Sequence, residues 1–179
     1  MTCLTILEFP DPRLRTRATP VAAVDGSLRE LIDDMLETMY AAKGIGLAAT
    51  QVDVHQRVLV MDVSEERNVP RAYINPEILS RDGVETSQEG CLSVPGYRFE
   101  VVRSERVTMR GLDLNGNEIV LEGDDLLARM VQHEIDHLDG VLLLDRVEPE
   151  VRREALRDMR TRELGATASI PRTGHDRGL

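Results

Sequence analysis

The sequence contains no tryptophan, and aromatic residues make up only 3% of its 179 positions. It therefore lacks the aromatic platforms on which many proteins stack single-stranded nucleic acid. Acidic residues outnumber basic ones, giving a formal net charge of −10, so we expect no DNA binding. No apolar run approaches the ~20 residues of a membrane span, and the N-terminal segment reaches Pro10 too early for a secretory signal. We therefore expect a cytoplasmic protein that binds no membrane.

Cysteine is also scarce, and the chain length limits the number of domains. The two cysteines, Cys3 and Cys91, are too few for a disulfide framework. A chain of this length fits one domain of ordinary size. We expect that single catalytic domain to cover residues 1–165. Residues 166–179 show neither hydrophobic period nor bulk, and this predicts a disordered tail.

Periodicity predicts three helices. The first begins with a capping box of Ser27 and Glu30, carries an apolar stripe, and can end at Gly44. The second covers about 124–138, with Asp124 as the N-cap. The third follows Pro149, because proline suits the first helical turn.

Between the first two helices the sequence predicts short strands. The dipeptide Asn115-Gly116 separates the last two strands and is a strong hairpin signal. The expected strands cover residues 57–63, 71–79, 97–102, 106–113 and 117–122. This order predicts an α+β fold in which small antiparallel or mixed sheets surround a central metal-binding helix.

The segment QHEIDH (132–137) suggests metal chemistry. His133 and His137 are four residues apart, so on a helix both imidazoles project from one face and can bind one ion. Glu134 lies beside them on a largely buried helix, where a carboxylate is costly without a polar or cationic neighbour. We therefore expect Glu134 to act as a general acid/base next to a bound metal.

Two ligands do not complete a site, and the sequence offers two candidates for the third. Glu148 would give the ligand set of a zinc endopeptidase, although no histidine follows at a metzincin-like spacing. Cys91 would give two nitrogens, one sulfur and an open position for water. A non-catalytic metal-binding module is the further alternative, but it needs a fourth protein ligand that the sequence does not offer.

Three stretches together resemble the signature motifs of the peptide deformylases of bacterial type. They are GIGLAATQ (44–51), EGCLS (89–93) and QHEIDHLDG (132–140), and the likeness covers roughly residues 4–165. The resemblance implies removal of the N-terminal formyl group from formyl-methionine of nascent polypeptides, with release of formate, by metal-bound water. It implies that Cys91, His133 and His137 hold the metal and that Glu134 is the general acid/base.

The resemblance also implies how the substrate is held. The side-chain amide of Gln51 and the backbone N–H of Leu92 would stabilise the oxyanion. The segment Gly44, Ile45 and Gly46 would pair with the bound peptide like an added strand.

We expect the methionine side chain in an apolar pocket formed by Ile45, Leu126 and Met130. Two positions depart from the pattern of the family that the chain resembles. Ser87 replaces a residue that is often bulky, and Arg129 replaces one that is often aliphatic. We also expect an ion pair between Glu89 and Arg103 beside the Cys91 segment, of the surface kind that contributes little.

A site of one cysteine and two histidines suits zinc or iron, and the affinity order favours zinc. The resemblance implies one divalent metal ion, Fe²⁺ in the cell, which Zn²⁺ or Ni²⁺ can replace after ordinary handling. We expect a monomer. In some bacterial relatives the last helix is thought to touch ribosomal RNA, which suggests transient ribosome contact through Arg153, Arg157 and Arg160. Acids interleave with these arginines, and this pattern favours a solvated helix instead.

Overall fold

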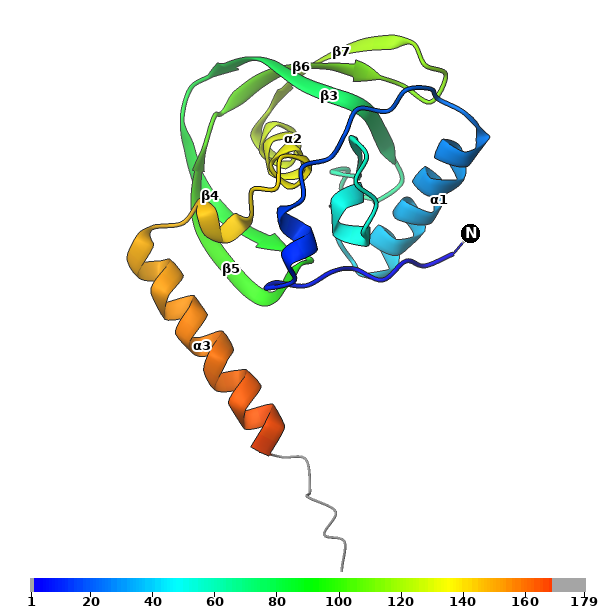
Figure 1. Cartoon of the computed structure of the whole chain (residues 1–179). Helices are drawn as coiled ribbons and strands as arrows, with labels where there is room; N and C mark the ends of the chain where they lie inside the picture. Colours follow the sequence, from blue (N-terminus) through cyan, green and yellow to red (C-terminus); the bar gives the residue numbers. More distant parts are fainter. Residues whose placement is uncertain (1, 169–179) are drawn as a thin grey trace, which may run out of the picture. The chain divides into compact units, whose positions relative to one another are not determined.

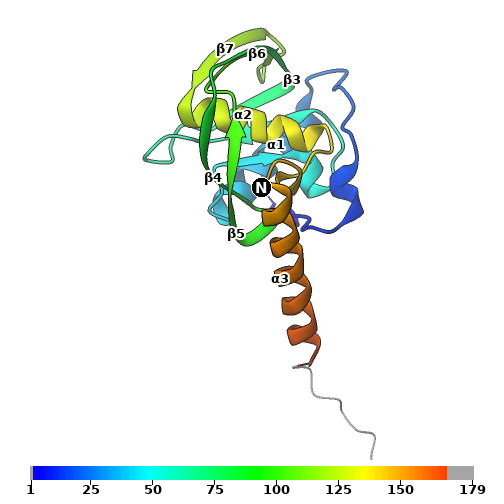
Figure 2. The same ribbon diagram turned by 90° about the vertical axis from the view of Figure 1, so that its left-hand side faces the viewer.

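Helix α2 (Asp125–Leu138) lies between two β-sheets in the computed structural model, which describes residues 2–168. Figure 1 shows α2 with the larger sheet on one side and the hairpin of β4 and β5 on the other, and Figure 2 gives the same arrangement from the side. Almost every residue from Ala128 to Leu138 is buried, polar ones included. The fold thus places the QHEIDH segment in the interior.

All the strand pairs of the two sheets are antiparallel. The larger sheet has the order β1-β2-β3-β6-β7 and the smaller one pairs β4 with β5. Their bounds are β1 (Gly46–Ala48), β2 (Val58–Met61), β3 (Arg71–Asp82), β4 (Glu85–Cys91), β5 (Val94–Arg103), β6 (Arg106–Leu112) and β7 (Glu118–Asp124). The predicted α+β fold is confirmed, and the sheets are antiparallel rather than mixed. Strand β4 was not predicted, because its sequence ETSQEGC is too polar for a strand signal.

The predicted hairpin at Asn115-Gly116 joins β6 to β7. Gly116 has a φ of 77°, which glycine adopts at little cost. The Asp113 carboxylate accepts hydrogen bonds from the backbone N–H groups of Asn115 and Asn117, at 2.9 and 3.0 Å. The turn is therefore fixed by residues within it, namely the Asp113 side chain and the glycine at position 116.

Helix α1 (Gly26–Ala41) packs its predicted apolar stripe into the core. Its N-cap is Asp25, two residues before the expected N-cap Ser27. The Asp25 carboxylate accepts from the Leu28 N–H at 2.9 Å, so Asp25 is the N-cap and the capping box of Ser27 and Glu30 is wrong. At the other end Lys43 has the left-handed conformation, with a φ of 58°, and the Gly44 N–H donates to the Met39 carbonyl at 2.9 Å. Asp124 precedes α2 as predicted, but its side chain makes no capping hydrogen bond.

Three 3-10 turns and the N-terminal segment connect these elements. The turns are η1 (Pro12–Arg15), η2 (Ala49–Val52) and η3 (Leu143–Asp145). The backbone N–H of Leu7 donates to the Gln51 carbonyl at 2.7 Å, and that of Phe9 donates to the Ser93 carbonyl at 2.8 Å. The first residues of the chain thus bind two of the three motif segments.

The chain divides into two compact units, and the boundary lies between Arg146 and Val147. The second unit contains helix α3 (Pro149–Ala168), which runs three residues into the range expected to be a tail. Residues 169–179 lie outside the described part of the chain. The predicted single domain over 1–165 spans both units and stays a prediction. Within residues 2–168, no helix is long and apolar enough to cross a membrane.

Replacing Asp25 by alanine should lower the free energy of unfolding by about 1 kcal/mol, because the Leu28 N–H loses its capping acceptor. Ser27→Ala is the matched control, and it should change the free energy by less than about 0.5 kcal/mol. Urea denaturation followed by circular dichroism measures both. A larger loss for Ser27→Ala than for Asp25→Ala would show that the capping box forms after all.

Candidate metal centre

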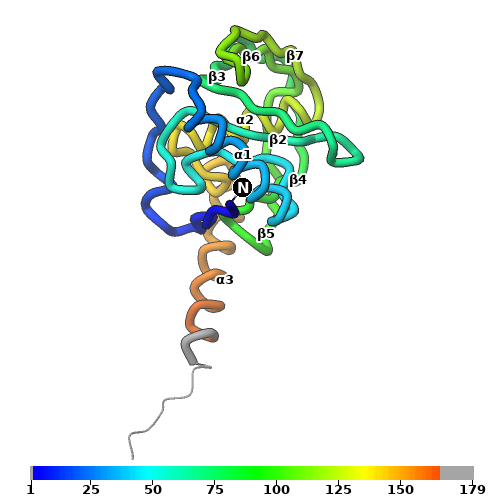
Figure 3. The backbone as a smooth tube through the Cα atoms, turned by 90° about the vertical axis from the view of Figure 1, so that its right-hand side faces the viewer, coloured from blue at the N-terminus to red at the C-terminus, as the bar shows by residue number. Residues whose placement is uncertain are grey.

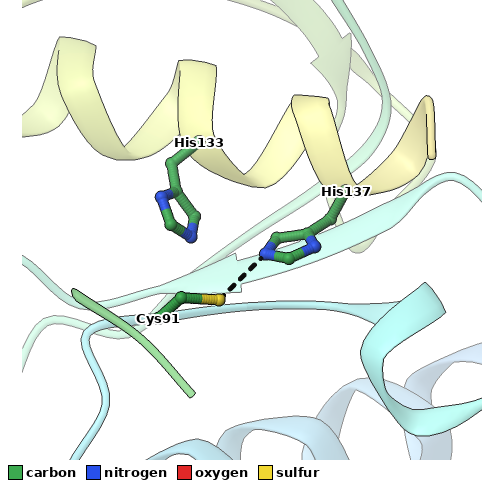
Figure 4. A group of neighbouring side chains, drawn as sticks. All are labelled: Cys91, His133 and His137. Carbon is green, nitrogen blue, oxygen red and sulfur yellow. Dashed lines mark hydrogen bonds between the residues drawn. The ribbon is translucent and has the colours of Figure 1, made fainter. Parts of the chain in front are cut away.

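Three predicted ligands from two elements meet in the interior. Cys91 is the last residue of β4, and His133 and His137 lie one turn apart on α2. Their candidate ligand atoms all lie within 4.8 Å of one another, and Cys91 Sγ is 3.3 Å from His137 Nε2. Figure 4 shows both imidazoles projecting from one side of the helix towards the sulfur. This is the geometry that the spacing of four residues predicts.

A buried carboxylate orients one of these imidazoles. Glu89 Oε1 lies 2.9 Å from His133 Nδ1, which leaves the other ring nitrogen to face Cys91. A carboxylate on the remaining N–H of a ligating histidine is the usual device that fixes its tautomer. Glu89 also accepts from Arg103 at 2.7 and 2.9 Å. The predicted ion pair therefore exists, but Glu89 is 2% and Arg103 8% exposed, so the expectation of a surface pair is wrong.

The ionisation of the site follows from this enclosure. Burial alone would raise the pKa of the Cys91 thiol, but the neighbouring imidazoles, His137 first, hold that pKa well below its ordinary value. Burial likewise opposes the charge on Glu89, but hydrogen bonds from His133 and Arg103 lower the pKa of its carboxyl to about 2. The site therefore favours a thiolate, the form in which cysteine binds metals.

Glu134 has the opposite environment. It is 2% exposed, and its Oε2 is buried without a hydrogen-bond partner among the described residues. Burial raises the pKa of this carboxyl, although the two histidines oppose the shift. A Cβ atom at Gly46 would lie 2.5 Å from Glu134 Oε1, so only glycine leaves room for the carboxylate there. The carboxylate is thus held beside the ligands with one oxygen available.

Gln51 approaches the ligands from η2. Its Oε1 accepts from the Ala48 N–H at 2.9 Å, which turns the Nε2 group towards the site. Nε2 donates to Ser93 Oγ at 3.0 Å and lies 3.8 Å from Cys91 Sγ. Ser93 is the last residue of the EGCLS motif, but its contact with Gln51 was not predicted, because sequence alone does not show which partner a serine hydroxyl finds.

The segment Gly44–Gly46 is held by the connection between β2 and β3, a loop that projects in Figure 3. The Asp62 N–H donates to the Ile45 carbonyl at 2.9 Å, and Arg67 donates to the Gly44 carbonyl. Tyr40 O–H donates to Asp62 at 2.6 Å. Burial disfavours the Asp62 charge, but hydrogen bonds from Ser64 and Tyr40 outweigh it and lower the pKa of this carboxyl to about 2. The segment is therefore bound by the backbone of Asp62, and the ionised side chain of Asp62 is itself buried and hydrogen-bonded.

A cavity of about 500 Å³ opens beside the ligands. Its lining includes all five residues expected to bind the substrate, namely Gly44, Ile45, Gly46, Leu126 and Met130, together with Cys91, Leu92, His133 and Glu134. Arg129 also lines it, but Ser87 is not among the lining residues. An arginine at position 129, where an aliphatic residue was expected, therefore forms part of the pocket lining.

The donor set fits one metal ion. Within residues 2–168 the cluster of potential ligands consists of Cys91, His133 and His137, and it includes no fourth protein ligand. Three ligands with an open position, next to a buried carboxylate, are the arrangement of a catalytic rather than a structural metal site. Fold and site together define the class of metal-dependent hydrolases.

Comparison with known proteins identifies the family within that class. The family model described as polypeptide deformylase matches residues 3–153. Peptide deformylases of Chromohalobacter salexigens and Xylella fastidiosa are 58% and 57% identical over 163 and 152 residues, which cover 90% and 83% of this chain and 96% and 89% of theirs. A crystal structure of a peptide deformylase from Legionella pneumophila has a TM-score of 0.86 and 43% identity, and covers 95% of this chain and all of its own. The chain belongs to the polypeptide deformylase family.

Replacing Cys91 by alanine should weaken binding of one Zn²⁺ by more than the 10- to 100-fold that loss of an outer partner costs, because a ligand itself is removed. Cys3→Ala is the matched control, since Cys3 is exposed, and it should bind zinc like the unmodified protein. Competition with a chelator measures both affinities. Unchanged affinity in Cys91→Ala would exclude Cys91 as a ligand and favour the endopeptidase arrangement.

Proposed function

We propose that this protein removes the formyl group from N-terminal formyl-methionine of nascent polypeptides and releases formate, with the residue roles that follow. The observation that supports this best is the meeting of Cys91, His133 and His137 beside a buried Glu134, in a chain of the deformylase family. The endopeptidase alternative needs a third ligand other than Cys91.

Cys91, His133 and His137 would hold one divalent metal ion. When bound, that ion would supply Lewis-acid activation of water and of the formyl oxygen. We propose Fe²⁺ as the ion in the cell, with Zn²⁺ or Ni²⁺ able to replace it. The thiolate and imidazole ligands suit all three ions, so the donor set alone does not select among them.

Glu134 would move the protons. Its available Oε2 and its raised pKa suit a carboxylate that takes a proton from the attacking water and later gives it to the leaving amine. Gly46 supports this role, because its lack of a side chain lets the carboxylate approach the cavity. The reaction then leaves a free N-terminal amine and formate.

Gln51 and Leu92 would stabilise the oxyanion. The Gln51 amide nitrogen is already turned towards Cys91 Sγ by the bond between its Oε1 and Ala48. The Leu92 backbone N–H directly follows the thiolate ligand in the chain. Fixed donors of this kind act on the charge that develops in the transition state and need no reorganisation.

The cavity would bind the start of the peptide. The segment Gly44–Gly46 would pair with the peptide backbone as an added strand. Ile45, Leu126 and Met130 would surround the methionine side chain, since all three line the same cavity. The backbone of this segment is held in place by Asp62 and Arg67.

We further propose that the protein is a cytoplasmic monomer that meets nascent chains near the ribosome. Arg153, Arg157 and Arg160 on α3 are exposed and could serve a transient ribosome contact. The pairing of Arg162 with Asp158 at 3.0 Å, one turn apart, instead fits a solvated helix. We favour the solvated helix.

The test is formate release from a formyl-Met peptide by protein purified without oxygen. The unmodified protein should release formate, and Glu134→Gln should lower the rate by about 10²- to 10⁴-fold, the usual contribution of a general acid/base. Metal content should stay at one ion per chain in both. Glu118→Gln, the same change at an exposed position on β7, is the matched control and should keep the full rate.

No formate from the unmodified, metal-loaded protein would contradict the proposed reaction. Formate at the full rate from Glu134→Gln would leave the reaction standing and contradict the role of Glu134.

A further inference from the structure

Arg129 belongs to the substrate cavity and to the support of the metal site at once. It lines the cavity with Leu126 and Met130, and it is only 3% exposed. Its guanidinium forms an ion pair with Glu89, the carboxylate that orients His133. Burying an arginine costs free energy unless a carboxylate pairs with its charge and acceptors take its hydrogen bonds. Glu89 supplies that carboxylate for Arg129.

The guanidinium connects α2 to both strands of the β4–β5 hairpin. Arg129 Nη1 donates to Glu89 Oε2 and to the Val101 carbonyl, the latter at 3.3 Å, and Nη2 donates to the Glu85 carbonyl at 3.3 Å. Glu85 and Glu89 lie on β4, and Val101 lies on β5. One side chain on the helix thus bonds a backbone carbonyl of each strand and the Glu89 carboxylate.

Arg129 also supplies counter-charge that Arg103 does not supply alone. Arg103 shares its charge between Glu89 and Asp136, which it contacts at 2.9 Å. Within residues 2–168, Glu89 is the only carboxylate paired with Arg129. Glu89 Oε1 faces His133 Nδ1 and Oε2 accepts from Arg129, while Arg103 donates to both oxygens. Arg129 and Arg103 together therefore hold the carboxylate in the rotation that presents Oε1 to the imidazole.

We propose that Arg129 is a positioning residue for the metal ligand His133 and that it acts through Glu89. It lies one helical turn before His133, so both side chains project towards the same carboxylate. Arg129 at the same time lines the cavity. The proposal rests on the metal site of the proposed function, and its test reads metal affinity separately from formate release.

Two substitutions separate the charge of Arg129 from its bulk. Arg129→Met keeps an unbranched apolar stem and removes the cation. Arg129→Lys keeps the cation within reach of Glu89 but loses the fork that bonds both strands. Arg110→Met is the matched control, because Arg110 is exposed on β6 and pairs with Glu77. Zinc affinity by chelator competition is measured for each variant.

Arg129→Met should weaken zinc binding by about 10- to 100-fold, the range for loss of an outer partner of a metal ligand. Arg129→Lys should recover most of that loss, and Arg110→Met should show none. In a Glu89→Gln background, Arg129→Met should cause no further loss, because its effect passes through Glu89. Independent structural roles would instead make the two losses multiply.

Unchanged zinc affinity in Arg129→Met, or multiplying losses in the double variant, would overturn the proposal. If Glu89→Gln fails to fold, the lysine variant decides, because affinity no better than that of Arg129→Met would equally overturn it. Failure of the proposed function has a different signature, namely normal zinc binding by the unmodified protein without formate release from a formyl-Met peptide.

Discussion

The buried carboxylate of Glu89 is the interaction that joins the two halves of the site. It lies on β4 two residues before Cys91 and contacts His133 on α2, so one side chain relates the strand that carries the thiolate to the helix that carries the imidazoles. A lone charge at this depth would cost several kcal/mol. Arg103 on β5 and Arg129 on α2 both form ion pairs with Glu89. The pKa of the Glu89 carboxyl is lowered to about 2. Glu89 is therefore a permanent, fixed acceptor.

Two glutamates on either side of His133 would thus take different roles in the proposed reaction, because their surroundings differ. Glu89 is surrounded by donors and stays ionised, whereas burial raises the pKa of Glu134 and leaves one of its oxygens without a partner. Pairs of carboxyl groups whose environments separate their pKa values are a recurring basis for assigning supporting and proton-transferring roles. The same enclosure that requires the arginines at Glu89 makes Glu134 suited to exchange a proton.

The parts of this site that could be predicted are those that depend on residues close together in the sequence. The four-residue separation of His133 and His137 predicts a shared helix face, and three short motifs predict the family. Strand β4 was not predictable, because its polar residues pair with β5 only in the folded chain. The depth of Glu89 was missed for a similar reason, since sequence shows a charge but not its burial. Arg129 precedes His133 by four residues, so the same helical rule could have placed it on that face.

X-ray absorption spectroscopy on the zinc-loaded, unmodified protein tests most directly whether these separate segments form one metal site. The ligand set of Cys91, His133 and His137 predicts one sulfur at about 2.3 Å and two imidazole nitrogens at about 2.0–2.1 Å, with an oxygen from solvent completing the shell. A shell of nitrogen and oxygen alone would contradict the account, because it would remove Cys91 and the β4 segment from the metal centre.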